Sequence, residues 1–306
     1  MIVLYGRLDD RPFAQVAEAA QRAGIAHHVV DQDSLSRYDL VTRPDGPDGR
    51  LSTDGVRIAL EDISALYTRP MVPAVGPPHH AESGRTALLH QQFVDWLDIT
   101  PSLVVNRPRA MESNTSKPYQ SQLIARAGFL VPDTLITNEP EDVRGFLARH
   151  GRVVYKSVSG VRSIVRELTA TDEGRLPLVR HLPTQFQEYV PGFDVRVHVV
   201  GERVLAAQVD STATDYRYAA RDGLPQPVLH RTDLPADVAA RCVELAAMLG
   251  LPFAGIDLRI RPDGAWVCFE VNPMPGFTYY QDGAGLPIAD AVVDLLVRGA
   301  PSDVPA

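Results

Sequence analysis

Strand and helix patterns alternate along the first third of the chain. Strand patterns at Ile2–Tyr5 and His27–Val30 flank a helical pattern over Pro12–Ala23 that stops at Gly24. This strand–helix–strand order predicts a small parallel sheet at the start of the chain. Val104–Asn106 is a further short strand, and we expect the first domain to end there.

Later in the chain the pattern changes to antiparallel hairpins separated by helices. Val195–Val200 and Arg203–Val209 form one hairpin across Gly201-Glu202. The interleaved start and the late hairpins together predict α+β units after an α/β start. Arg43–Ser52, rich in Pro, Gly and Asp, is expected to be a loop. Other strand patterns cover Val56–Leu60, Leu66–Tyr67, Thr134–Thr137, Arg152–Lys156, Ile164–Leu168 and Thr184–Val190, and helical patterns cover Ala87–Leu97, Ser113–Ala127, Pro140–His150, Asp237–Leu249 and Ile288–Val297.

The segment Gly255–Asn272 predicts a hairpin with one apolar and one polar face. Its turn is Arg261-Pro-Asp-Gly264, where proline presets φ and glycine tolerates a positive φ. If the first and last residues of this turn pair, Asp257 lies opposite Cys268. Glu270 is then the diagonal neighbour of Asp257, roughly 7–8 Å away between backbones.

The polar face of this hairpin carries a candidate metal site. Because side chains alternate with a period of two, Asp257, Glu270 and Asn272 point to the same side. Two carboxylates and a carboxamide oxygen are hard ligands of the kind that Mg²⁺ takes. A surface hairpin with a solvated polar face gives the same pattern. Against that alternative, Phe269-Glu-Val-Asn-Pro273 surrounds its carboxylate with apolar neighbours, where an unpaired charge is costly.

Two lysines and a polar strand end predict an anion site beside the hairpin. Lys156 ends the otherwise apolar strand Val153-Val-Tyr-Lys, and a lysine buried in that way needs an anion. Lys117 begins a helix, and Gln187-Glu-Tyr-Val190 ends another strand shortly before Asp194. With magnesium, these are the parts of a nucleoside triphosphate site. A solvated lysine at a helix start and a charged edge strand are the alternatives for Lys117 and Glu188.

Composition narrows the class of protein. A chain of 306 residues is long enough for two or three packed units, and 45% hydrophobic content is typical of globular proteins. The net charge of −8 leaves no basic surface for nucleic acid or membranes. Cys242 and Cys268 cannot form a disulfide framework, so we expect both to be reduced and the protein to be cytoplasmic. No apolar run is long enough to span a bilayer.

In this order the segments resemble the ATP-grasp ligases, from about Leu103 to the last helix. The strongest motifs are Val105-Asn106 with Lys117, Val154-Tyr-Lys156, Gln187-Glu-Tyr-Val190, Asp194-Val-Arg-Val-His-Val-Val-Gly201, Gly255-Ile-Asp257 and Phe269-Glu-Val-Asn-Pro273. The resemblance implies a Rossmann-like pre-ATP-grasp domain over residues 1–105. A two-lobed ATP-grasp fold would follow, with a central lobe over residues 106–183 and a C-terminal lobe over residues 184–306.

The resemblance also implies an activity and its cofactors. Family members join a carboxylate to an amine or alcohol through an acyl phosphate, using ATP and Mg²⁺ and forming ADP. By this resemblance Lys117 and Lys156 contact the phosphates, Gln187, Glu188, Tyr189 and Val190 border the adenine, Asp194 holds the ribose, and Asp257, Glu270 and Asn272 bind Mg²⁺.

Two arginines are implied as catalytic groups. Arg196 matches a family arginine that steadies the acyl phosphate. Asp215-Tyr-Arg217 resembles an element of the ribosomal-protein glutamate ligase and of the maturases that crosslink ribosomal peptides, known as graspetides. We assign Arg217 to the substrate carboxylate or the γ-phosphate, because guanidinium suits bidentate oxyanions. A salt bridge to Asp215 within the turn is the alternative.

Tyr67-Thr-Arg-Pro70 and Pro275-Gly-Phe-Thr-Tyr-Tyr280 are closer to the peptide-crosslinking maturases. The expected reaction is therefore an ester or amide crosslink between side chains of a ribosomally made peptide. Ligation of small molecules such as amino acids is the second expectation, and a non-catalytic nucleotide-binding module ranks last. The sequence leaves open the substrate, and whether the first domain serves a homo-oligomer or a peptide-docking surface.

Overall fold

The computed structural model describes residues 1–43, 46–53, 55–71, 81–157, 165–211, 213, 216–219 and 223–299, without the side chains of residues 81–83 and 217. The sequence expectations for residues 72–80, 158–164 and 301–306 lie outside this range. Within it, no helix combines the length and the apolar character needed to cross a membrane.

The N-terminal domain is built on a parallel four-stranded sheet, as predicted. Its strands β1 (Ile2–Gly6), β2 (His27–Asp31), β6 (Ala65–Thr68) and β7 (Leu103–Val105) follow the order β2-β1-β6-β7. One face of the sheet packs on α1 (Arg11–Arg22), and the other packs on α2 (Ala81–Ile99). Asp10 caps α1 by accepting a hydrogen bond from the Phe13 backbone N–H.

A second, antiparallel sheet in this domain was missed. The expectation of a loop over Arg43–Ser52 is wrong, because β3 (Asp39–Arg43), β4 (Gly46–Thr53) and β5 (Val56–Ala59) pair with one another. Gly49 lets two strands approach closely, since a Cβ there would collide with the Val41 carbonyl. The glycine that suggested a loop therefore serves a strand.

The central lobe is a four-stranded sheet covered by α5 (Pro140–His150) and the 3₁₀ segment η4 (Ala170–His181). Its strands are β8 (Thr134–Thr137), β9 (Val153–Ser157), β10 (Arg166–Glu167) and β11 (Thr184–Glu188), in the order β10-β9-β11-β8. We expected Thr184–Glu188 in the C-terminal lobe, but β11 pairs with both β8 and β9. We propose that the junction between the lobes follows Glu188.

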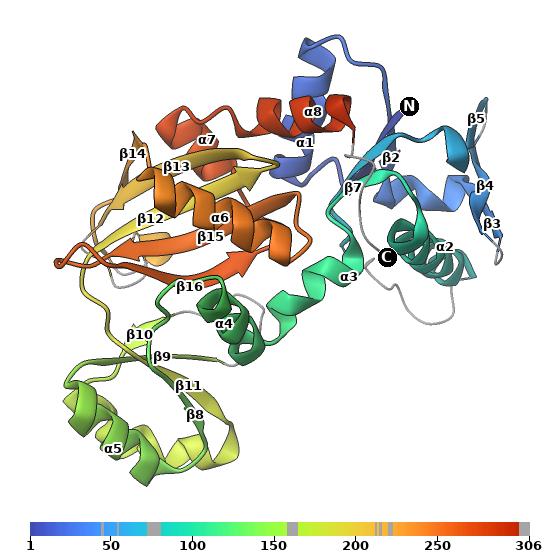
Figure 1. Cartoon of the computed structure of the whole chain (residues 1–306). Coiled ribbons are helices and arrows are strands. Elements are labelled where there is room, and N and C mark those ends of the chain that lie inside the picture. The colour runs from blue at the N-terminus through green and yellow to red at the C-terminus, as the bar shows by residue number, and fades with distance from the viewer. Residues whose placement is uncertain are drawn as a thin grey trace.

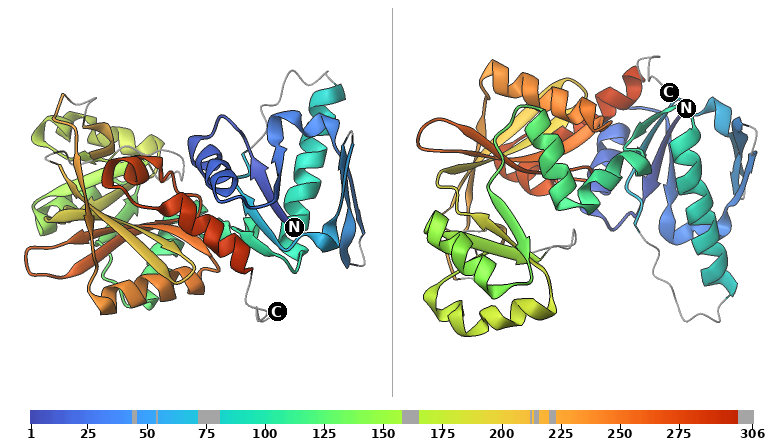
Figure 2. Two further views of the ribbon diagram at one scale, coloured as in Figure 1. Left: turned by 90° about the horizontal axis from the view of Figure 1, so that it is seen from above. Right: turned by 60° about the horizontal axis from the view of Figure 1, so that its bottom comes forward.

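The C-terminal lobe is an antiparallel sheet in the order β14-β13-β12-β15-β16. Helix α6 (Ala236–Met248) packs on one face, and α7 (Thr278–Ala284) and α8 (Ile288–Arg298) pack on the other. Figures 1 and 2 show α8 lying beside α1, so the C-terminal lobe shares an apolar core with the N-terminal domain. The strands are β12 (Phe193–Val200), β13 (Arg203–Asp210), β14 (Val228–Thr232), β15 (Phe253–Ile260) and β16 (Trp266–Asn272).

The helix expected over Ser113–Ala127 is broken. A short helix α3 (Pro108–Met111) and the 3₁₀ turn η3 (Glu112–Thr115) precede α4 (Lys117–Arg126). Pro118 lies in the first turn of α4, where its missing N–H has no intrahelical partner to lose. Lys117 is the first residue of α4, so its side chain lies at the N-terminal end of that helix. The strand β14 and the helix α7 were not expected from the sequence.

Candidate functional site

The hairpin β15–β16 has a different register from the one expected. Its turn contains three residues rather than two, because Arg261 pairs with Ala265 and Gly264 adopts a left-handed φ of 83°. A second shift falls between Asp257 and Leu258, which leaves Phe269 as an extra residue.

Together the two shifts bring Asp257 directly opposite Glu270, and Cys268 pairs with Leu258 in the core. The expected diagonal arrangement is therefore wrong. The backbones of Asp257 and Glu270 therefore lie closer than those of a diagonal pair, since directly opposite residues have the shortest cross-strand separation.

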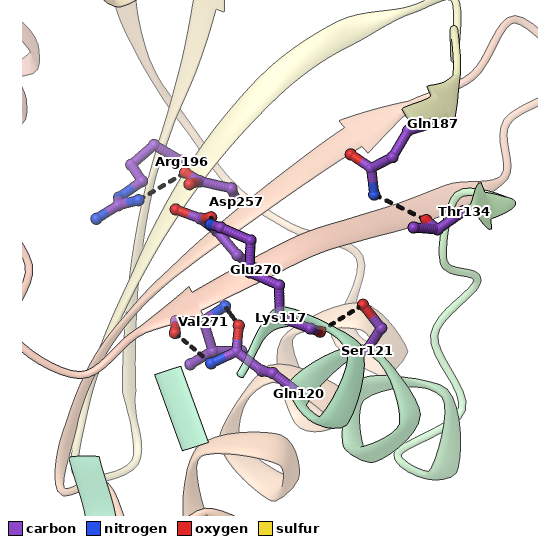
Figure 3. Close-up of polar contacts among 9 residues, drawn as sticks. All are labelled: Lys117, Gln120, Ser121, Thr134, Gln187, Arg196, Asp257, Glu270 and Val271. Carbon is purple, nitrogen blue, oxygen red and sulfur yellow. Dashed lines mark hydrogen bonds and ion pairs between the residues drawn. The ribbon is translucent and has the colours of Figure 1, made fainter. Parts of the chain in front are cut away.

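Cations from two other elements hold these carboxylates. Arg196 on β12 donates to Asp257 at 2.6 Å, and Lys117 on α4 donates to Glu270 at 3.2 Å. Figure 3 shows the two pairs converging on the same side of the hairpin. The carboxylates keep part of their surface in the cavity, whereas the cations are more deeply buried. Such a site offers both oxygen atoms and positive charge to a bound ligand.

The oxygen donors fit a hard divalent cation. Asp257 and Glu270 supply carboxylates, and Asn272 lies two residues beyond Glu270 on the same strand. The Asn272 Oδ1 accepts a hydrogen bond from the Met274 backbone N–H at 3.0 Å, which fixes the orientation of the carboxamide. No cluster of three His, Cys, Asp or Glu side chains gathers among the described residues.

A cavity between the two lobes collects the other residues that the sequence singled out. It is lined by polar groups from both lobes and by the apolar side chains of Val154, Leu258 and Phe269. A flat aromatic base suits such walls, because it stacks against apolar side chains while its edges meet polar groups. The predicted site residues in its lining are Lys156, Gln187, Glu188, Tyr189, Val190, Asp194, Asp257 and Glu270.

Lys117 and Lys156 are the only lysines of the chain, and both lie at this site. Lys156 on β9 is 8% exposed, so its ammonium is drawn toward the protein and the cavity rather than toward bulk water. All other permanent side-chain cations are arginines. The alternative of a solvated Lys117 is wrong, because its ammonium is ion-paired and largely buried.

Polar contacts orient the strand end at β11. Gln187 donates to Thr134 at 3.0 Å, as Figure 3 shows, and Glu188 accepts from the Asp133 backbone N–H at 3.0 Å. The guanidinium of Arg152 lies 3.5 Å from the centre of the Tyr189 ring. These contacts hold residues 187–189 against the rest of the central lobe. Glu188 is therefore hydrogen-bonded, and the alternative of a merely solvated charge on an edge strand does not hold.

Arg259 is a site residue that the sequence reasoning missed. It makes a bidentate ion pair with Asp194, at 2.8 and 2.9 Å, and donates to the Val190 carbonyl at 2.8 Å. Strand pairing brings Asp194 opposite Arg259. Opposite charges at facing positions of β12 and β15 were the signal, but reading it needs the pairing of two strands that are far apart in the sequence.

The surroundings of Arg196 leave little freedom. The side chain is 6% exposed, and a Cβ on Gly255 would collide with its guanidinium. Burial lowers the pKa of Arg196, but the charge of Asp257 and the neighbouring Tyr280 and Tyr216 more than offset that, so its pKa is raised. The guanidinium is therefore a fixed positive charge at all working pH values.

The element around Arg217 is described only in part. Asp215 and the side chain of Arg217 lie outside the described residues, so their assignment stays a prediction. Tyr216 lines the cavity, and its hydroxyl lies 2.6 Å from that of Tyr280. Burial raises the pKa of Tyr216 well above its ordinary value, which keeps the phenol neutral. Tyr216 is a second cavity residue that the sequence analysis did not single out.

Comparison with known proteins agrees with this architecture. Residues 115–296 match the RimK-like ATP-grasp domain. The beta-citrylglutamate synthase B of Danio rerio is 30% identical over 267 residues, which cover 83% of this chain but only 63% of that protein. The probable alpha-L-glutamate ligase of Xanthomonas oryzae pv. oryzae is 28% identical, with 81% of this chain and 84% of that protein covered.

Solved structures extend the likeness over the N-terminal domain. The ATP-grasp ligase PsnB, complexed with a phosphomimetic variant of its minimal precursor, Mg and ADP, superposes with a TM-score of 0.81. The two sequences are 28% identical, and 97% of each chain is covered. The macrocyclase MdnC of Microcystis aeruginosa, bound with precursor peptide MdnA, shares the fold with a TM-score of 0.80 and 22% identity.

The expected fold class, a Rossmann-like domain followed by a two-lobed ATP-grasp fold, is thereby confirmed. ATP-grasp enzymes use ATP with Mg²⁺, and the oxygen ligands and buried cations described above fit that pair. The chain belongs to the RimK-like ATP-grasp family and is an ADP-forming ligase.

Proposed function

We propose that this protein uses ATP and Mg²⁺ to crosslink side chains of a ribosomally made peptide. A side-chain carboxylate of the peptide would be converted to an acyl phosphate, and a Thr or Ser hydroxyl or a Lys amine of the same peptide would attack it. Ester or amide crosslinks would form. The observation that carries the ligase chemistry is the direct opposition of Asp257 and Glu270, each held by a buried cation, at the cavity between the two lobes.

The residues divide the work in this proposal. Asp257, Glu270 and Asn272 would hold Mg²⁺, which supplies charge neutralisation at the phosphate oxygens. Lys156 and Lys117 would contact the phosphates, and in this structure Lys117 is ion-paired with Glu270. The nucleoside would lie between the lobes, with its base at the segment Gln187 to Val190 and its ribose at Asp194.

The chain's fixed charges account for the transfer step. The incoming carboxylate and the terminal phosphate are both negative, so they meet only where positive charge is concentrated. Arg196 supplies such a charge, and its contacts with Asp257 and Gly255 keep it in one position. We assign Arg217 to the substrate carboxylate. Carbon–oxygen or carbon–nitrogen bond formation then expels phosphate, and the attacking hydroxyl or amine loses its proton.

The second part of the proposal is that the substrate is a peptide rather than a small molecule. It is supported by the likeness to PsnB, which was solved with a variant of its minimal precursor. That likeness covers 97% of this chain, the N-terminal domain included, at 28% identity. Small-molecule ligation is the second candidate. It is supported by relatives named as glutamate ligases and as beta-citrylglutamate synthase, whose sequences are similarly close.

Mass spectrometry tests the two against each other. The purified protein would be incubated with ATP, Mg²⁺ and a peptide that is encoded beside its gene and rich in Thr or Ser and Glu or Asp. We expect successive losses of water from the peptide. Product from free amino acids, with the peptide unchanged, would overturn the peptide proposal in favour of the second candidate.

A parallel incubation with hydroxylamine separates a ligase from a non-catalytic module. Hydroxylamine intercepts an acyl phosphate as a hydroxamate while ADP accumulates. Failure to form hydroxamate or ADP with the peptide and with a broad panel of carboxylates would overturn the ligase proposal.

A further inference from the structure

The strand that carries Glu270 and Asn272 lies at the edge of its sheet. In the order β14-β13-β12-β15-β16, strand β16 has a partner strand on one side only. An edge strand exposes backbone N–H and C=O groups that need other partners. Here those partners come from outside the sheet: the Leu130 carbonyl accepts from the Cys268 N–H at 2.8 Å, and the side chain of Asn106 donates to the Pro273 carbonyl.

Gln120 satisfies the edge at the residue between the two proposed metal ligands. Its Nε2 donates to the Val271 carbonyl at 2.8 Å, and its Oε1 accepts from the Val271 N–H at 3.0 Å. A carboxamide has the same donor and acceptor as a peptide group, so Gln120 acts as one residue of a missing neighbouring strand. The side chain is 3% exposed, and the same contacts are drawn in Figure 3.

The same helix carries Lys117. Residues three apart lie on one face of a helix, so Lys117 and Gln120 both face β16. Gln120 bonds to Val271, and Lys117 reaches Glu270, the preceding residue of the strand. A shift of α4 along β16 would break both bonds of Gln120. The carboxamide therefore fixes the position of the helix along the strand.

We propose that Gln120 is a positioning residue that locks α4 onto β16 and so places Lys117 opposite Glu270. The inference rests on the proposed function in taking Glu270 as a metal ligand and Lys117 as a phosphate contact. Gln120 itself would contact neither the metal nor the phosphates. Leucine at this position would leave both backbone groups of Val271 buried without a partner. Glutamate would keep the acceptor but lose the donor unless it is protonated.

Calorimetric titration with MgADP measures the effect without any carboxylate substrate. We expect Gln120→Leu to bind MgADP about tenfold more weakly or worse, the size found when a partner behind a metal ligand is lost. The matched control is Gln122→Leu, since Gln122 is an exposed glutamine on the same helix. Affinity in Gln120→Leu equal to that of the wild type would overturn the proposal.

Gln120→Glu adds a signature that simple destabilisation does not give. Burial raises the pKa of a carboxyl group, and its protonated form can again donate to the Val271 carbonyl. The MgADP affinity of Gln120→Glu, relative to the wild type, should recover as the pH falls from about 8 to about 5.5. Gln120→Leu and Gln122→Glu should show no such recovery. A flat ratio for Gln120→Glu across this range would contradict the assigned role.

A double-mutant cycle tests the same idea in nucleotide-free protein. Thermal unfolding of Lys117→Met, Glu270→Gln and the double variant gives the coupling between these two side chains. We expect coupling in the wild-type background and none in the Gln120→Leu background. Equal coupling in both backgrounds would sink the inference. A wild type that fails to bind MgADP would overturn the proposed function alone. The cycle needs no nucleotide, so it would still test the role of Gln120.

Discussion

Two partly buried polar clusters, one in the N-terminal domain and one in the C-terminal lobe, differ in the partners of their hydrogen bonds. In the N-terminal domain, the Tyr5 hydroxyl lies 2.6 Å from the His90 Nδ1, and Gln32 contacts both His90 and the backbone of Met71. In the C-terminal lobe, Asp257 and Glu270 pair with cations but still border the cavity between the lobes.

The difference separates a structural cluster from a reactive one. Polar groups that bond one another within the protein stabilise the fold but have fewer donors and acceptors left for a ligand. Asp257 and Glu270 line the cavity and keep part of their surface exposed there, so they can accept further partners. The comparison therefore predicts that changes in the first cluster alter stability, whereas changes in the second alter turnover.

The largest expected effect is the loss of turnover in Glu270→Gln. Replacing a proposed charged metal ligand by an amide should lower ADP formation by about a hundredfold or more, the range found for groups that stabilise transition-state charge. The fold should be kept, because glutamine has nearly the shape of glutamate and its amide oxygen can still accept a hydrogen bond from Lys117. Glu244→Gln, on the exposed face of α6, is the control. Full activity in Glu270→Gln would remove the metal assignment.

Amine-selective labelling gives the next largest effect. Lys117 and Lys156 are the only lysines, so an acetylating reagent can modify only these two side chains and the N-terminal amine. We expect MgADP to protect both lysines about tenfold or more, because a bound phosphate in contact with their amino groups shields them from the reagent. The N-terminal amine is the internal control. Peptide mass spectrometry that finds equal labelling with and without MgADP would contradict the phosphate contacts.

A pH effect on stability should follow from His198, beside Arg196 on β12. Burial, reinforced by the Arg196 charge, lowers the pKa of His198 well below its ordinary value of 6.5. Neither ring nitrogen has a hydrogen-bond partner in the described part of the chain. Below pH 6.5 the unfolded chain takes up a proton that the folded protein excludes, so stability present above that pH is lost as the pH falls.

The expected slope is at most about 1.4 kcal/mol per pH unit for one such group. Denaturant unfolding at a series of pH values should show a shallower acid slope for His198→Leu than for the wild type. His181→Gln, at an exposed position, should keep the wild-type slope. Identical slopes in all three proteins would show that His198 is protonated in the folded state.

The smallest expected effect lies in the N-terminal cluster. Tyr5→Phe removes only the hydroxyl that contacts His90 and should cost about 1 kcal/mol of unfolding free energy. Turnover at saturating substrate should stay unchanged. Tyr119→Phe, at an exposed position, is the matched control. A loss of turnover in Tyr5→Phe, with stability kept, would place this cluster in the reaction and break the comparison.

Local patterns predicted most elements but not their alignment. Alternation and turn chemistry were enough for the hairpin and the place of its turn, but not for the pairing of Arg261 with Ala265 across three turn residues. They failed at Phe269, because a bulge changes the register without changing the pattern of apolar residues around it. They failed again at β4, where Gly49 indicates a loop by composition but allows close strand approach in the fold.

The sequence by itself determined the residue types of the site. It supplied one lysine at a strand end and one at a helix start, and two carboxylates and an amide on one hairpin. It also supplied the order of motifs that marks the family. Each of these is a local property, because it depends on residues within one or two elements.

Only the tertiary structure decided which groups meet. The direct opposition of Asp257 and Glu270, the pairing of Arg259 with Asp194 and the bonds from Gln120 to Val271 join residues that are distant in sequence or displaced by a bulge. Such contacts depend on register and packing, in which a shift of one residue exchanges every partner. A chain can therefore show which groups it holds for chemistry before it shows how they are brought together.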